Sequence, residues 1–231
     1  MTQTVLAHRT TVPYAIASED IPALSTHHPL GKIKKEEAEE VALIRDWFPD
    51  FAFAHLFHYM LEEKQRLYSW QEFCKWFQGE AVSGWLWEPS RQMVARAMAE
   101  GWSRQRADEA MRWRVGNFYY SFLREMHVIA ALRERGLPML FHPLADALFR
   151  VDAWCGNVLL ELFVGNPMYK AGSRGGRKHR TEDYFADQPG FKVVRFEMRV
   201  QKTFGVVHVP PPWQIDRCAA AIRRALNSSH P

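Results

Sequence analysis

Residues 147–164 read ALFRVDAWCGNVLLELFV, and this stretch decides the fold of the second half of the chain. Gly156–Asn157 divides it into two runs of alternating polarity. Both residue types tolerate a positive φ, so the pair predicts a two-residue turn between antiparallel strands. The turn also sets the register, with Cys155 facing Val158.

This register brings two carboxylates face to face. Asp152 is expected opposite Glu161, and Arg150 opposite Phe163. Opposed carboxylates repel each other and require a shared proton, a cation or a metal. The alternative is a solvent-facing pair on an ordinary half-exposed hairpin. The other face of the hairpin is wholly apolar and is expected to pack on a core, with Phe149, Val151, Ala153, Cys155, Val158, Leu160, Leu162 and Val164.

The composition is that of a globular protein with many aromatic side chains. The 231 residues are 47% hydrophobic, include nine Trp and fifteen Phe, and carry a net charge of +4. Three scattered cysteines form no CxxC pair, so neither a zinc knuckle nor a disulfide framework is expected. The absence of a long apolar run or a signal-like start predicts a cytoplasmic location without a membrane.

Three regions follow one another along the chain. Residues 1–31 show no clear period and are interpreted as an extended or mobile arm. Residues 32–107 are expected to form an aromatic-rich helical region, in which Ser69 and Glu72 form a capping box. Residues 108–231 alternate between helical and strand patterns and predict a mixed α and β core with a C-terminal helix.

The helical region contains a possible DNA-reading segment at residues 90–114. Ser90 is expected to begin one helix, Gly101 to end it, and Ser103 to begin a second helix. A helix, a Gly-containing turn and a basic helix outline a helix-turn-helix. A plain helical hairpin fits the same pattern. The second helix would carry Arg104, Arg106, Arg112 and Arg114.

A third acidic residue lies on the next expected helix, which starts at Asn117. Glu125 falls within its apolar stripe, where a carboxylate is costly unless it is paired or bound to a cation. Residues 138–144 are then expected to begin the sheet. A glutamate at the edge of the stripe, reaching solvent or an arginine, is the alternative.

The segment after the hairpin is rich in glycine and in positive charge. It has no GKS or GKT, so it is not a Walker loop. It predicts either a contact with nucleic-acid phosphates or a solvated loop. Its basic residues are Lys170, Arg174, Arg177, Lys178 and Arg180.

From residue 108 to residue 200 the chain resembles the PD-(D/E)xK nuclease superfamily, which has the restriction-endonuclease-like fold. The order helix, strand, strand, strand, helix, strand carries an acid in the first helix, in the second strand and in the third strand. The segment FADQPGFKVVRFEM has the form seen just before and within the fourth core strand of that family. The resemblance implies a helix, a three-stranded antiparallel meander, a helix and a strand.

The resemblance also implies the roles of the acids. Asp152 and Glu161 would hold Mg²⁺ or Mn²⁺, with Glu125 completing the site, and the metal would activate a water for attack on a phosphodiester. The family's lysine is expected two residues after Glu161, where this chain has Phe163. Arg150 is the first candidate for the missing cation, and the second candidates are Lys170 and Lys178.

The predicted function is a metal-dependent DNA endonuclease, in a defence or mobile-element setting that the resemblance implies. The alternative is a catalytically inactive protein of the same fold that acts as a DNA-binding or assembly subunit. A protein partner or a second copy of the chain is compatible with either prediction. A helical regulator acting through residues 90–114 is the third possibility.

Overall fold

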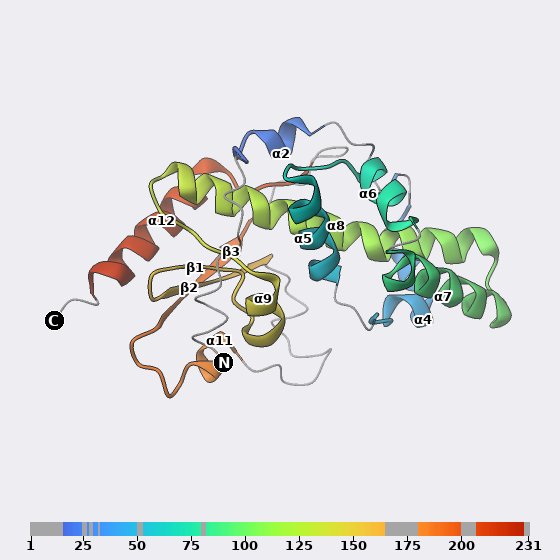
Figure 1. The fold of residues 1–231 in the computed structure, drawn as a ribbon. Coiled ribbons are helices and arrows are strands. Elements are labelled where there is room, and N and C mark those ends of the chain that lie inside the picture. Colours follow the sequence, from blue (N-terminus) through green and yellow to red (C-terminus); the bar gives the residue numbers. More distant parts are fainter. Residues whose placement is uncertain are drawn as a thin grey trace. The chain divides into compact units, whose positions relative to one another are not determined.

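The fold was analysed on a computed structural model of the chain. It describes residues 16–24, 27, 30–31, 33–49, 53–79, 82–164, 180–199 and 207–228. The chain divides into two compact units. Unit 1 comprises Met1–Pro22, Arg124–Lys202 and His208–Pro231, and unit 2 comprises Ala23–Leu123 and Thr203–Val207. Figure 1 shows the elements of both.

The described part of unit 2 is helical. Its helices are α3 (Lys35–Glu39), α4 (Ala42–Arg45), α5 (Phe53–Lys64), α6 (Trp70–Phe77), the 3₁₀ turn η1 (Ser83–Trp85), α7 (Trp87–Ala99) and the first part of α8 (Arg104–Glu134). The capping box of α6 is confirmed. The Glu72 N–H donates to the Ser69 hydroxyl at 3.1 Å, and the Ser69 N–H donates to the Glu72 carboxylate at 2.8 Å.

Aromatic side chains form the core of unit 2, which explains their abundance in this part of the sequence. Phe57 stacks on Phe122 with ring centroids 5.5 Å apart. Tyr68 and Tyr119 are fully buried. Each hydroxyl donates to a backbone carbonyl at 2.8 Å, Tyr68 to Phe57 and Tyr119 to Tyr68. These bonds satisfy polar groups that burial would otherwise leave unpaired.

Two expected helix boundaries in this region are wrong. Ser90 is buried inside α7 and does not cap it. Helix α8 runs through Gly116 without a break, so the two helices expected around it are one. A mid-helix glycine costs about 1 kcal/mol relative to alanine, and burial of flanking apolar side chains such as Val115 outweighs this cost. The Ser103 cap is confirmed, because the Arg106 N–H donates to its hydroxyl at 3.2 Å.

Unit 1 holds a small mixed sheet and the helices around it. After the end of α8 come α9 (Pro143–Phe149), β1 (Ala153–Cys155), β2 (Val158–Val164), α11 (Thr181–Tyr184), β3 (Lys192–Met198) and α12 (Pro212–Asn227). Helix α2 (Asp20–Ala23) spans the point in the sequence at which unit 1 gives way to unit 2. The described strands are ordered β1-β2-β3. Strand β1 is antiparallel to β2, and β3 is parallel to β2.

The predicted turn is confirmed. Cys155 pairs with Val158, and the antiparallel ladder continues to Ala153 and Leu160. Gly156 has a φ of +57°, the left-handed conformation that favours glycine. The two residues of the turn therefore fix the register of the hairpin, as the sequence predicts.

The expected antiparallel meander is wrong in two places. Residues 143–149 form helix α9, so the first hairpin strand starts only at Ala153. The strand expected over residues 138–144 is reduced to one bridge between Leu140 and Trp154. Pro143 suits the first turn of a helix, and the His142 ring accepts the Leu144 N–H at 3.1 Å. Local capping thus overrides the strand pattern. The α+β class holds, and the restriction-endonuclease-like arrangement stays a prediction.

Helices lie against both faces of the sheet (Figure 1). Helix α12 packs on β2 and β3. The opposite face carries Trp154 and Leu159, which form a buried cluster with Ala145 of α9, Val151, and Phe185 directly after α11. The hairpin is therefore buried on both faces close to its turn. No helix of the described residues is long and apolar enough to cross a bilayer.

Candidate functional site

The three acids predicted from the sequence all lie in unit 1. Glu161 is on β2 and is 3% exposed. Asp152 directly precedes β1, and Glu125 is on α8; both are half-buried. Asp152 does not extend the ladder as a regular strand residue, but its N–H donates to the Leu160 carbonyl at 3.0 Å.

The acids influence one another electrostatically. Burial raises the pKa of Asp152 well above its usual range, and the charges of Glu125, Asp146 and Glu161 raise it further. Burial and the charge of Asp146 likewise raise the pKa of Glu125. Carboxylates from α8, α9, the start of the hairpin and β2 therefore share one partly buried environment.

Asp146 is a member of this group that the sequence reasoning missed. It lies in the first turn of α9, between two segments interpreted as strands. The signal that would have found it is His142-Pro143, a cap followed by a proline that suits the start of a helix. With residues 143–149 taken as helix, Asp146 would have lain one turn before Arg150.

Glu161 is held by two arginines. The Arg150 guanidinium lies 3.1 Å from Glu161 Oε1, and the Arg195 guanidinium lies 3.0 Å from Oε2. The Thr181 hydroxyl lies 3.2 Å from Oε2 and 3.1 Å from the Arg150 carbonyl, so its single proton serves one acceptor at a time. These contacts offset the cost of burying the Glu161 charge.

Arg150 reaches Glu161 by a route that the sequence did not indicate. It was expected on a strand, opposite Phe163. Instead it ends α9 in the left-handed conformation, with a φ of 58°. Its N–H donates to the Asp146 carbonyl at 2.9 Å. A non-glycine residue in this region is strained, and here the strained backbone carries the guanidinium to the acid.

Arg195 is the second arginine of the site, and sequence reasoning missed it. It lies on the strand predicted at residues 191–200, but only the parallel pairing places it beside Glu161. Its guanidinium carbon is 5.2 Å from the centroid of the Phe163 ring. Phe163 stands where the resemblance expects lysine, so a cation-π contact holds an arginine next to that position.

The Asp152 carboxylate is hydrogen-bonded to the backbone of β2. Its Oδ2 accepts the Leu162 N–H at 2.5 Å, a bond that lowers the pKa of Asp152 but less than burial raises it. Magnesium and manganese prefer such oxygen donors. Within the part of the chain described, no three His, Cys, Asp or Glu side chains are grouped as a complete metal shell.

Most of the predicted basic loop lies outside the described residues, namely Lys170, Arg174, Arg177 and Lys178. Arg180 is described and is exposed at the start of α11. Its backbone N–H donates to Asp183 Oδ2 at 2.7 Å. A phosphate contact of these residues stays a prediction.

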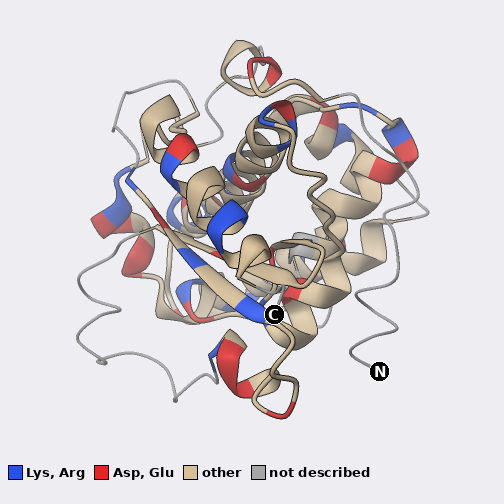
Figure 2. Cartoon of the chain, turned by 90° about the vertical axis from the view of Figure 1, so that its left-hand side faces the viewer, with Lys and Arg blue, Asp and Glu red and all other residues tan. Residues whose placement is uncertain are grey.

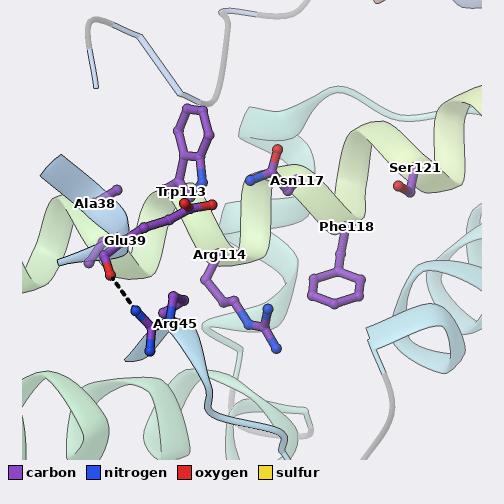
Figure 3. A pocket seen from close by; sticks show the side chains of 9 residues that line it. Ala38, Glu39, Arg45, Trp113, Arg114, Asn117, Phe118 and Ser121 are labelled. Atoms are coloured by element: carbon purple, nitrogen blue, oxygen red, sulfur yellow. Dashed lines mark hydrogen bonds between the residues drawn. The ribbon is translucent and has the colours of Figure 1, made fainter. Parts of the chain in front are cut away.

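The arginines of the possible helix-turn-helix belong to unit 2, and three of them bind within that unit. Arg104 forms an exposed ion pair with Asp108 at 3.5 Å. Arg106 forms an ion pair with Glu37 at 2.5 Å. Arg114 donates to the Trp47 carbonyl at 2.9 Å and lines a cavity of about 220 Å³ together with Phe118. Figure 3 shows this cavity, with the hydrogen bond from Arg45 to the Glu39 carbonyl. The exposed pair Arg104 and Arg112 is what a DNA-reading surface would retain.

In comparisons with known proteins, no family model, no curated protein and no solved structure matches the chain. Unit 1 combines half-buried carboxylates of raised pKa with two arginines that meet on Glu161. Hard oxygen donors beside fixed guanidinium groups suit the chemistry of a cation together with a phosphate.

Proposed function

We propose that this protein is a divalent-metal-dependent phosphodiesterase that cleaves nucleic acid, with DNA as the first substrate to test. The observation that carries the proposal is the geometry of the hairpin acids: Asp152 accepts the Leu162 N–H, and Arg150 and Arg195 meet on the neighbouring Glu161. The same acids support membership of the PD-(D/E)xK superfamily as part of the proposal.

The donor set fits Mg²⁺ or Mn²⁺. Asp152 would be the central ligand, with Glu125 or Asp146 beside it. Magnesium commonly binds through one or two carboxylates plus a substrate phosphate, so a complete protein shell is not required. When bound, the metal would activate a water and polarise the scissile phosphate. The carboxylates would hold the cation between them and lose their mutual repulsion.

The arginines would act on the phosphate. Arg195, supported by the Phe163 ring, and Arg150 would stabilise negative charge that builds on the phosphoryl oxygens. Neither would serve as a general base, because a guanidinium does not lose its proton in proteins. Arg150→Gln and Arg195→Gln would test their roles separately. Full activity of Arg150→Gln would show that Arg150 does not replace the missing lysine.

The decisive experiment measures cleavage of supercoiled DNA, linear DNA and RNA with Mg²⁺, with Mn²⁺ or with EDTA. Asp152→Asn keeps the side-chain shape and removes the charge. Asp187→Asn is the matched control, since Asp187 is exposed on the turn after α11. Metal-dependent cutting that is lost in Asp152→Asn and kept in Asp187→Asn is expected. Equal cutting by Asp152→Asn and by the parent protein would contradict the proposal.

One observation favours the rival function, a non-catalytic nucleic-acid-binding or assembly subunit. Both Glu161 oxygens are engaged by arginines, and the expected lysine position holds Phe163. In that protein the arginines would only neutralise the acid. Binding of DNA by folded protein, without cutting under any metal condition, would establish this alternative.

A further inference from the structure

A groove of about 420 Å³ lies between β3 and α12, within unit 1. Its charged and aromatic lining residues are Arg195, Glu197, Arg199, Trp213, Arg217 and Arg224. The lining includes four arginines and one glutamate, so it is strongly positive. All four arginines are exposed.

Most of this positive charge meets no acid within the part of the chain that the structure describes. Among the described residues, no ion pair engages Arg199, Arg217 or Arg224. Arg195 differs, because its ion pair with Glu161 joins one end of the groove to the acidic site. Unpaired arginines in a groove attract an anion, and a row of them suits a polyanion.

Helix α12 contributes one face to the groove. Trp213, Arg217 and Arg224 lie on the same side of the helix, since their spacing follows whole turns. The Trp213 side chain is 50% exposed, which is unusual for a large aromatic residue. The Arg217 guanidinium carbon is 5.9 Å from its ring centroid, a cation-π contact between two residues that line the groove.

The two walls of the groove are fixed to each other by Gln214. Its buried amide accepts the Arg199 N–H at 2.9 Å and donates to the Arg199 carbonyl at 3.0 Å. This pair of bonds occupies the backbone of Arg199, directly after β3.

We propose that this groove binds single-stranded nucleic acid, with phosphates on Arg199, Arg217 and Arg224 and one base stacked on Trp213. An aromatic face beside a basic track is the general means of binding unpaired nucleotides. The inference rests on the proposed function, because the ligand of the groove and the substrate of the phosphodiesterase are both nucleic acid. It adds a track that leads along β3 to Arg195 and the acids.

The test is binding of a labelled single strand of about 12 nucleotides, within the usual site size, by the full chain in EDTA, which prevents cleavage. DNA, RNA and a matched duplex are compared by fluorescence anisotropy. Arg217→Gln combined with Arg224→Gln is expected to weaken binding of the single strand about tenfold or more and to reduce its salt dependence. Trp213→Ala is expected to weaken it at least about fivefold, whereas Trp213→Phe keeps most of the affinity.

Arg91→Gln is the matched control. Arg91 lies 6.0 Å from the Trp87 ring on α7, so it repeats the arginine–tryptophan pair on another exposed helix. It is expected to bind like the parent protein. Circular dichroism and thermal unfolding establish that each variant is folded, and the substituted groove residues are exposed.

Three outcomes would overturn the inference: parental affinity in the groove variants, an equal loss in Arg91→Gln, or no binding of oligonucleotide by the parent chain. The last outcome is also what a groove reserved for a protein strand would give. Cleavage without groove-dependent binding would refute the groove and leave the proposed function standing. Groove-dependent binding without metal-dependent cleavage would support the groove and refute the proposed function.

Discussion

At the scale of residues, Glu161 is the point at which the contacts of unit 1 converge. A nearly inaccessible carboxylate receives Arg150, Arg195 and the Thr181 hydroxyl from three separate segments. Each partner removes part of the cost of burying the charge, and loss of any one leaves an oxygen less satisfied.

Thr181→Val tests this balance, because it removes the hydroxyl and keeps the branched shape. Thr181 is fully buried. The free energy of unfolding is expected to fall by about 1–2 kcal/mol, the cost of an unsatisfied buried polar group. Urea unfolding measures it. Thr181→Ser retains the hydroxyl, so its free energy of unfolding is expected to fall less than that of Thr181→Val. A larger fall in Thr181→Ser would show that packing of the methyl group, and not the hydrogen bond, causes the effect.

Asp152→Asn is expected to change the pH dependence of stability. The ordinary pKa of the group is 3.8, and the fold raises it. Below 3.8 both the folded and the unfolded chain hold the proton, so the carboxyl group costs nothing. As pH rises toward the folded pKa, the unfolded chain releases the proton first, and stability falls. The variant has no such proton, so its stability relative to the parent protein should increase with pH.

Thermal unfolding of both proteins without metal, at a series of pH values upward from 4, measures this difference. A constant difference across the series would mean that Asp152 titrates normally in the fold. Asp187→Asn is again the control, because Asp187 is exposed on the turn after α11.

At the scale of elements, the hairpin turn depends on one glycine. Gly156 has a φ of +57°, and a Cβ added there would lie 3.3 Å from Leu226 Cδ2 of α12. Both the turn and the packing of α12 on the sheet therefore exclude a larger residue. Because β1 is short, this turn is the main determinant of the register between β1 and β2.

Gly156→Ala is expected to lower the free energy of unfolding by about 1–2 kcal/mol, the cost of the left-handed conformation for an L-residue. Chemical denaturation measures the loss. Gly190→Ala is the matched control, since nothing lies within 4 Å of a Cβ built there. Equal stability of the two variants would show that the turn relaxes without strain.

At the scale of the whole molecule, charges of both signs occur along the described elements (Figure 2). Figure 2 shows Lys and Arg interspersed with Asp and Glu along the described elements. The net charge of +4 therefore says little about where a polyanion would bind. Local arrangements decide it, such as the groove beside α12 in unit 1 or the exposed arginines of α8 in unit 2.

A bound divalent cation is expected to stabilise the whole chain. Mg²⁺ or Mn²⁺ would bind the folded protein and not the unfolded one, so the melting temperature should rise with metal concentration. At one hundred times Kd the gain is about 2.7 kcal/mol. The rise should be larger at pH 8 than at pH 5, because the ligands must lose their protons. Thermal unfolding measures it without any substrate.

Asp152→Asn should show no such rise, and Asp187→Asn should show the parental rise. A metal-dependent rise of equal size in Asp152→Asn would place the cation elsewhere in the chain. That result would remove the physical basis of the proposed phosphodiesterase while leaving the groove beside α12 untouched.

The sequence by itself determined the features that depend on neighbouring residues. Gly156–Asn157 fixed the turn and its register, Ser69 and Glu72 fixed the start of α6, and the 191–200 pattern predicted β3. Turn conformations and helix caps are properties of a few consecutive residues, so their signals are local and can be read directly.

Only the tertiary structure decided which charged groups meet. Arg195 reaches Glu161 because β3 is parallel to β2, and Asp146 approaches the other acids because residues 143–149 are helical. Gly116 lies inside α8 because burial of neighbouring side chains outweighs the preference of one residue. Strand pairing and packing join segments far apart in the sequence, and the energies that select them are sums over many contacts that no local pattern contains.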